Sequence, residues 1–300
     1  KMPMTPALFS VSYAGLWGQH KLDLKAFIAK AASLGYPAVQ LMGKRPHLSV
    51  LDTTERDLAE IREAAAKHKV EIVTIGAYTD FTSGRQNPSA RFIPTAEIQT
   101  AYVKRLGEMA RFLGARIVRL FTGYEASSPK EDWDVCVIAI RECAKILGDM
   151  GIVCGVQNHH DIGGSAEALR EFIGDVNHPN CKAMFDPWAP AQHGDDLRKV
   201  AKEMAPIMVQ TTIADYARFR RFRYVSGLDL FERREDMFRP VAVGEGFADY
   251  KPFFKGLKEG GFSGYVVYEM CSPLRGGGSE ENLDRTARKS LEAIKKLIGS

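Results

Sequence analysis

The 300-residue sequence lacks several features that would assign it to a class at once. It has no run of about eighteen or more apolar residues, so we expect neither a membrane span nor a membrane partner. Its five cysteines form no CxxC pair, which argues against a zinc knuckle or a redox dithiol. Charge is nearly balanced, with 41 Lys and Arg against 37 Asp and Glu, so charge alone does not indicate a nucleic-acid partner.

The cysteines are scattered and mostly lie in apolar runs, which is typical of buried, reduced thiols. Reduced thiols favour a cytoplasmic protein. The start, KMPMTPALF, lacks the charged and apolar regions of a signal peptide, although an exported form stays open.

One pattern recurs along the chain: an amphipathic helix, a small or glycine-containing turn, and a short, continuous apolar strand. Together with an apolar segment at 8–15, it predicts eight strands, each followed by a helix. The fold class is therefore α/β, a single (β/α)8 TIM barrel over residues 1–300. A doubly wound open sheet is the competing fold, but no GxGxxG follows the first strand. The helices that precede strands are expected at 22–34, 55–68, 96–113, 134–150, 166–173, 195–204 and 250–259.

Two connections that follow strands are unusually long, at 79–94 and 215–246. Active sites of such barrels lie at the end where strands run into helices. We therefore expect both to be long loops over the site.

The segment 151–161, GIVCGVQNHHD, ends an apolar strand in five successive polar residues. Buried polar groups without partners are costly, so such a strand end is typical of a site wall. Gln157 and His159 share a face because side chains alternate along a strand. By the same alternation, His160 is expected to point toward the barrel exterior.

Strands six to eight also end in polar residues. Asp186 follows strand six, Gln210 and Thr212 lie on strand seven, and Glu269 ends strand eight. Carboxylates with amide or imidazole neighbours suit a hard divalent ion, so we expect Mn²⁺ or Mg²⁺. The alternative is that the carboxylates cap helices or pair with arginines.

Other candidates have both functional and structural interpretations. Trp188 and Tyr13 lie near strand ends and could stack on a sugar or pack in the core. The segment RFRRFR at 218–223 could be a solvated lid or a clamp for an anionic substrate, and nucleic-acid binding is the least favoured interpretation. His193 is either a lid residue or a neighbour of the next helix.

Four segments make a family resemblance plain: Asn158-His159 after strand five, Asp186 after strand six, TIAD with Arg218 after strand seven, and GEGFADYKPFFKGLKEGGFSGYVVYEM at 244–270. With them the chain resembles the sugar phosphate isomerase/epimerase family. These are the xylose isomerase-like TIM barrels of the AP endonuclease 2 superfamily, which also include endonuclease IV.

The resemblance implies one divalent metal held by Glu, Asp, His and Glu on strands five to eight. It also implies that the two glutamates move protons on either side of a keto-sugar carbon. Asp186 and Glu269 match, whereas Gln157 stands at the first glutamate position and Thr212 at the histidine position, with Gln210 two residues earlier. An amide can ligate a metal but cannot act as a base, so the two-base mechanism does not carry over intact.

The resemblance further implies that Arg218 binds substrate. The multi-zinc site of endonuclease IV needs many histidines, and only seven are scattered through this chain. Glu269 is therefore the expected base, with His159 as an acid or an orienting group, and Arg218, Trp188, His160 and Tyr13 as substrate contacts. The expected metal shell is Gln157, Asp186, Gln210 and Glu269.

The favoured function is a metal-dependent isomerase or epimerase that removes a proton next to a carbonyl of a keto-sugar or polyol. A lyase acting on 3-keto-glycosides is the second hypothesis, and a non-catalytic sugar-binding barrel is the third. The expected partner is a small carbohydrate, and a homo-oligomer stays open.

Overall fold

A computed structural model describes residues 4–87, 89, 92–125 and 128–299. Its main sheet confirms the TIM barrel: eight parallel strands in the order β6-β5-β4-β3-β2-β1-β10-β7. A parallel bridge between Ala183 and Met208 links the two edge strands and nearly closes the barrel. The barrel strands are β1 (Thr5–Phe9), β2 (Ala38–Met42), β3 (Glu71–Gly76), β4 (Ile117–Leu120), β5 (Val153–Gln157), β6 (Cys181–Met184), β7 (Gln210–Ile213) and β10 (Tyr265–Tyr268).

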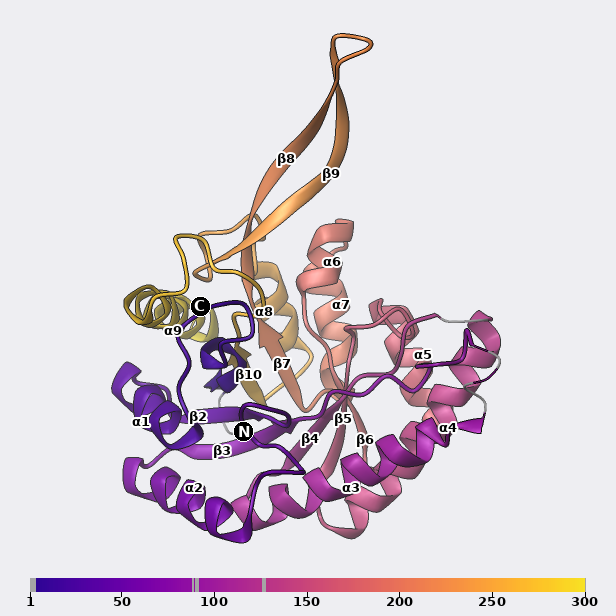
Figure 1. The fold of residues 1–300 in the computed structure, drawn as a ribbon, viewed down its shortest axis with the longest axis vertical. Helices are drawn as coiled ribbons and strands as arrows, with labels where there is room; N and C mark the ends of the chain where they lie inside the picture. Colours follow the sequence, from indigo (N-terminus) through magenta and orange to yellow (C-terminus); the bar gives the residue numbers. More distant parts are fainter. Residues whose placement is uncertain (1–3, 88, 90–91, 126–127, 300) are drawn as a thin grey trace.

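Helices surround the barrel, as the repeated pattern predicts (Figure 1). They are α1 (Leu24–Leu34), α2 (Glu55–His68), α3 (Thr95–Leu113), α4 (Pro129–Asp149), α5 (Ala166–Val176), α6 (Trp188–His193), α7 (Leu197–Met204), α8 (Lys251–Glu259) and α9 (Glu280–Gly299). Helix α4 begins before the predicted 134, because Pro129 suits a first turn that also carries two acidic residues. The short helix α6 was not predicted, and His193 is its last residue.

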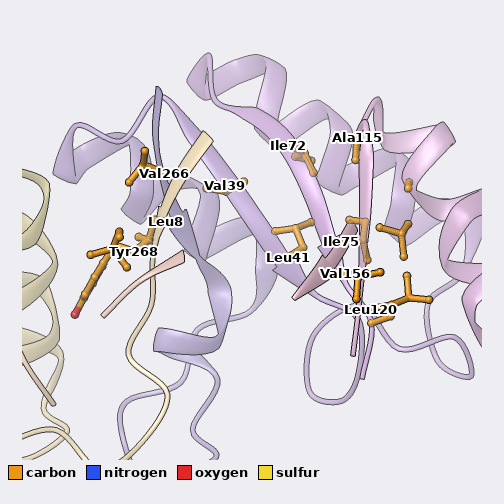
Figure 2. Packing of buried hydrophobic residues seen from close by; sticks show 14 of the residues in the cluster. Leu8, Val39, Leu41, Ile72, Ile75, Ala115, Leu120, Val156, Val266 and Tyr268 are labelled. Carbon is orange, nitrogen blue, oxygen red and sulfur yellow. The ribbon is translucent and has the colours of Figure 1, made fainter. Parts of the chain in front are cut away.

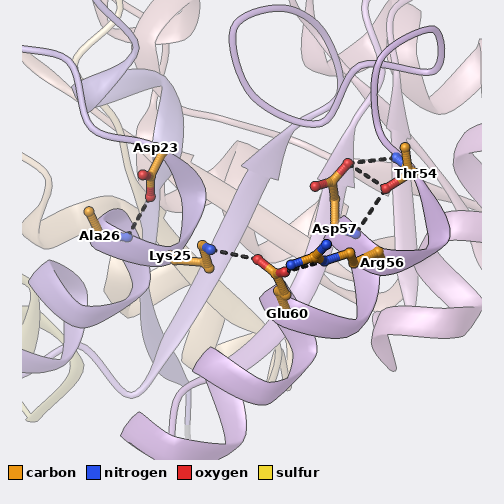
Figure 3. Close-up of polar contacts among 7 residues, drawn as sticks. All are labelled: Asp23, Lys25, Ala26, Thr54, Arg56, Asp57 and Glu60. Carbon is orange, nitrogen blue, oxygen red and sulfur yellow. Dashed lines mark hydrogen bonds and ion pairs between the residues drawn. The ribbon is translucent and has the colours of Figure 1, made fainter.

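Local capping explains where α1 and α2 begin (Figure 3). The Asp23 carboxylate accepts a hydrogen bond from the first turn of α1. Thr54 and Asp57 form a reciprocal capping box at the start of α2. Lys25 of α1 pairs with Glu60 of α2 at 2.6 Å, an exposed ion pair between neighbouring helices.

Alternation along the strands separates an outer face from an inner face. Leu8, Val39 and Val266 pack outward against the helices, in the core that Figure 2 shows. Phe9 and Val267, of opposite parity, belong to a smaller cluster inside the barrel. The residue after β10 that shares the parity of Val267 is Glu269, so the strand directs that carboxylate inward.

The segment predicted as a loop at 215–246 is mostly a long antiparallel hairpin, β8 (Asp215–Val225) and β9 (Leu230–Val241). It projects away from the barrel beyond α6 (Figure 1). Phe222 and Phe231 near its tip are 55% and 69% exposed. The prediction of a loop over the site was wrong here, because residues 215–225 pair with residues 230–241 across an antiparallel ladder.

The other predicted loop, 79–94, includes residues 88, 90 and 91, which lie outside the described residues. Its described start is tied to the barrel mouth, since Thr79 donates to the Phe121 carbonyl. Arg85 from the same connection pairs with the buried Asp132 of α4 at 2.8 Å. Within the described residues, no helix is both long and apolar enough to cross a membrane.

Candidate active site

Inward-facing residues at the carboxyl ends of four strands form the polar group that we call the mouth group: Arg119, Gln157, Asp186 and Glu269. Arg119 lies on β4, Gln157 ends β5, and Asp186 and Glu269 follow β6 and β10. Their parity matches that of the inner-face residues on the same strands. Strand alternation therefore brings together three of the residues predicted from sequence and one that was not.

Arg119 is the central cation of this group and is only 2% exposed. Its Nη1 donates to Gln157 Oε1 at 3.1 Å, and its Nη2 donates to the Ala77 carbonyl at 3.0 Å. The guanidinium lies 3.9 Å from the Phe121 ring centroid. Gly76 opposite provides the space, because a Cβ there would come within 3.1 Å of Nη2.

Gln157 connects this cation to Asp186. Its Nε2 donates to Asp186 Oδ2 at 2.9 Å, while the Trp188 amide donates to Oδ1 at 3.1 Å. Asn158 clamps the backbone of Asp186 through both its amide atoms. Burial raises the pKa of Asp186 to about 6, against the opposing effect of these hydrogen bonds and of Arg119.

Glu269 faces the cavity, and the shift of its pKa is the one most useful for proton transfer. Burial, opposed by the charge of Arg119 and helped by that of Asp186, raises its pKa to about 7. The Cys271 thiol hydrogen-bonds this carboxyl and lies 3.1 Å from the Tyr216 hydroxyl. Burial raises the pKa of that thiol, so Cys271 is a neutral neighbour. A carboxyl that titrates near neutrality can accept a proton and return it.

The cavity at the barrel mouth has a volume of about 440 Å³. Phe9, Val11, Trp17 and Phe121 make its apolar walls. Its polar lining includes Arg119, Lys44, Asp80, His159, His160 and Glu269. This mixture of apolar walls and a few convergent polar groups is typical of a small-molecule site.

The two histidines both line this cavity. The prediction that His160 points outward was wrong, because β5 ends at Gln157 and alternation stops before the histidines. Burial lowers the pKa of His159 to about 3 and that of His160 to about 4. Both imidazoles are therefore neutral near pH 7, and His160 Nδ1 is buried with no hydrogen-bond partner.

Gln157 and Asp186 are not among the residues that line this cavity, and four other predicted site residues also lie away from its lining. Tyr13 is fully buried and donates to Asp284, a core position. Trp188 packs on Tyr216 with a centroid separation of 3.9 Å, at the base of the hairpin. Arg218 lies on β8 and pairs with Asp236.

Gln210 is the fourth, and it belongs to a separate polar set inside the barrel. Its Oε1 accepts from Thr74 Oγ1 at 2.6 Å, and its Nε2 donates to Gln40 Oε1 at 2.7 Å. We call Gln40, Thr74 and Gln210 the inner trio. Gln210 is the first residue of β7 rather than its last, so the prediction placed it at the wrong depth.

Sequence reasoning missed Arg119, Lys44 and Tyr78. Lys44 Nζ lies 3.8 Å from the Tyr78 ring centroid, and burial followed by Arg119 lowers its pKa. Arg119 could have been found, because it is a charged residue in the middle of the apolar run IVRLF. A charge at such a position needs partners or a ligand.

The expected Mn²⁺ or Mg²⁺ does not fit the donors as they are arranged. Gln157 Oε1, the atom that could ligate, already accepts from Arg119 Nη1. A cation about 2.1 Å from that oxygen would lie within roughly 5 Å of the guanidinium. Repulsion at that separation costs several kcal/mol at an effective dielectric constant of about 20. In the described part of the chain, no three His, Cys, Asp or Glu side chains gather into a metal-binding group.

Comparison with known structures gives barrels that match this chain over nearly its whole length. D-allulose 3-epimerase from Methylomonas sp. has a TM-score of 0.73 and 17% identity, with 99% of each chain covered. D-psicose 3-epimerase from Clostridium cellulolyticum H10 has a TM-score of 0.75 and 17% identity, covering 98% and 99%. A probable 3-DHS dehydratase from Bacillus anthracis has a TM-score of 0.72 and 16% identity, covering 97% and 99%. At such identities the likeness shows the fold alone.

No curated protein sequence matches the chain. The family described as xylose isomerase-like TIM barrel matches residues 28–297, which confirms the resemblance seen in the sequence. The chain therefore belongs to the xylose isomerase-like TIM barrel family.

Proposed function

We propose that this barrel removes a proton from the carbon next to a carbonyl of a sugar-like substrate, with Glu269 as the base. One observation carries the proposal: the Glu269 carboxyl faces the cavity with a pKa of about 7. A base is most effective when its pKa lies near the working pH. The family, which includes sugar epimerases and dehydratases, supports this class of chemistry.

The number of bases narrows the reaction. Asp80 and Glu269 are the carboxylates that line the cavity; Thr82 donates two hydrogen bonds to Asp80 Oδ1, whereas Glu269 is the one whose pKa is raised to about 7, so we assign the proton transfer to Glu269. Epimerisation at one carbon needs a base on each face of the substrate. A single base can instead carry a proton between adjacent carbons, which is isomerisation.

Elimination is the second candidate, and the same single base favours it. One base removes the proton next to the carbonyl, and the leaving group departs with a proton from another donor. The neutral imidazole of His159 or His160, or water, can supply that donor at the cavity wall. A lyase acting on a 3-keto-glycoside is therefore retained beside the isomerase.

The apolar walls of the cavity are suited to contact the apolar face of a carbohydrate ring, opposite the polar groups. Trp17 and Phe9 line the cavity, whereas Trp188 and Tyr13, the aromatic residues expected from sequence, do not. Members of the family commonly use divalent metals. The donors of this chain do not fit Mn²⁺ or Mg²⁺ as they are arranged, and no step proposed here depends on either ion.

Hydrogen exchange tests the base directly. The enzyme is incubated in D₂O with D-fructose, D-tagatose and a 3-keto-glucoside, and deuterium next to the carbonyl is followed by NMR and mass spectrometry. We expect wild type to exchange at least one of these, and Glu269→Gln to lose about 10²- to 10⁴-fold of the rate. Glu245→Gln, an exposed glutamate paired with Lys289, is the matched control and should keep the wild-type rate.

The products separate the two reactions, since an isomerase conserves the mass of the substrate and a lyase releases an aglycone or water. Full exchange by Glu269→Gln would contradict the base assignment. Tight sugar binding with no exchange by wild type would favour the non-catalytic sugar-binding barrel.

A further inference from the structure

We propose that the Arg119 guanidinium takes the place of a divalent metal in this barrel and binds the substrate oxygen on which negative charge develops. This rests on the proposed function, because removal of a proton next to a carbonyl sends the electron pair to that oxygen. The resulting enediolate needs a fixed positive charge beside it.

Arg119 contacts the group at the strand-five position, where the family resemblance implies a metal ligand. Its Nη1 lies 3.1 Å from Gln157 Oε1, and Gln157 in turn bonds Asp186. The charge of Arg119 also acts on Glu269 and Asp186, the other two residues expected to ligate. The guanidinium thus interacts with all three positions at once.

No carboxylate neutralises this buried cation directly. Among the described residues, no ion pair joins Arg119 to Asp or Glu, although only 2% of the residue is exposed. The partners of Arg119 are two neutral oxygens and aromatic rings, so its positive charge is left for a negatively charged ligand to balance. The cavity on which Arg119 borders is where such a ligand can lie.

Arg119 also keeps hydrogen-bonding capacity in reserve. Its Nε is buried and has no hydrogen-bond partner, while Nη1 and Nη2 hold the fork in place. Lys44 adds a second cation to the same cavity. Two cations that border one cavity suit a planar, oxygen-rich anion such as an enediolate.

Gln157 fits this interpretation better than a glutamate would. A carboxylate there would pair with Arg119 and neutralise it, whereas the amide oxygen orients the guanidinium and leaves its charge for the ligand. The amide nitrogen meanwhile donates to Asp186 Oδ2. The replacement of the family's glutamate by Gln157 is therefore consistent with a site that uses the charge of Arg119.

Oxalate, a small planar dianion, is the probe for this site. Its affinity is measured by calorimetry on protein dialysed against EDTA, with EDTA kept in the buffer. We expect wild type to bind oxalate, Arg119→Met to bind it at least 50-fold more weakly, and Arg119→Lys about 10-fold more weakly. Arg116→Met, which removes an exposed arginine paired with Glu71 before the same strand, is the matched control and should bind as wild type does.

Thermal unfolding of each variant shows whether it is folded, and Arg119→Lys keeps the charge if Arg119→Met does not fold. Absence of oxalate binding to EDTA-treated wild type would overturn the inference, as would an Arg119→Met affinity equal to that of wild type. Tight binding of Mn²⁺ by wild type, with a dissociation constant below about 10 μM, would also overturn it.

Failure of this inference and failure of the proposed function look different. Glu269→Gln should bind oxalate at least as tightly as wild type, because a like charge is removed. Loss of hydrogen exchange in Glu269→Gln together with unchanged oxalate affinity in Arg119→Met would leave the base assigned and the cation rejected. The reverse pattern would keep the cation and reject the base.

Discussion

Two polar sets lie next to each other inside this barrel, and they differ in how completely they are bonded. The inner trio, Gln40, Thr74 and Gln210, is linked by side-chain hydrogen bonds, and each of its residues is at most 1% exposed. The mouth group keeps an unpartnered Nε on Arg119 and two carboxyls whose pKa values are raised. The two sets meet at Gly76, where a Cβ would lie 3.1 Å from both Arg119 and Gln40.

The difference shows how to tell polar residues that stabilise a barrel core from polar residues that act in a functional site. A buried polar network with its partners in place rigidifies the core and specifies its packing. Donors left unused beside a cavity, and carboxyls held away from their ordinary pKa, are typical of functional sites. By this criterion we expect the inner trio to serve stability and the mouth group to serve the proposed chemistry.

The largest effect on stability is expected from the inner trio. Gln210→Leu removes one amide and leaves Thr74 and Gln40 without the partners seen here. Each unsatisfied buried group costs about 1–3 kcal/mol, so we expect a loss of roughly 2–4 kcal/mol in urea unfolding. Turnover per folded molecule should stay within about twofold of wild type.

Gln192→Leu is the matched control for this variant, because Gln192 is an exposed amide on α6. It should change unfolding by less than about 0.5 kcal/mol. A Gln210→Leu protein with wild-type stability and strongly reduced turnover would contradict the distinction between the two sets. It would mean that Gln210 takes part in the active site.

The second effect concerns pH and belongs to the mouth group. The base form of Glu269 is lost as pH falls through about 7, so the rate should fall about tenfold for each pH unit below that value. The pH profile of kcat/KM on the substrate found by exchange measures this. A profile that stays flat down to pH 5 would contradict Glu269 as the base.

Stability should move in the opposite direction for the same residue. The folded pKa of about 7 lies above the ordinary value of 4.5. The stabilisation that comes from a neutral Glu269 is thus complete below pH 4.5 and is lost as pH rises through 7. His159 and His160, with lowered pKa values, destabilise the fold as pH falls below about 6.5, so the measurement is the difference in Tm between wild type and Glu269→Gln. That difference should favour the variant more at pH 8 than at pH 5.

Much of the barrel follows from periodicity alone, whereas the depth of each residue within it does not. Helix 55–68 was predicted with its observed bounds, and Glu269 was placed correctly at the end of a strand. Gln210 and Glu269 could not be ranked by depth, because depth depends on how far neighbouring strands are shifted against one another.

Arg119 was missed for a different reason. It lies inside an apolar strand, whereas the site residues were sought only at the ends of strands. The inner-face parity that exposes it becomes decisive only when Gly76 and Gly155 on the neighbouring strands are seen to lie opposite it. Likewise the aromatic residues spaced among the arginines at 215–225 are a strand signal that the high arginine content concealed.

The smallest effect is expected from Cys271, which only adjusts the pKa of Glu269 in the mouth group. Cys271 donates to Glu269 and thereby lowers the carboxyl pKa, against the larger effect of burial. Cys271→Ala should therefore move the midpoint of the pH profile upward by a few tenths of a pH unit, with kcat at pH 9 within about twofold of wild type. Cys136→Ala, at a buried thiol of α4, is the control and should leave the midpoint unchanged. A Cys271→Ala midpoint that moved downward would mean that the thiol does not stabilise the ionised carboxylate. Glu269, on which the proposed chemistry depends, would then lack the stabilising hydrogen-bond partner that each residue of the inner trio has.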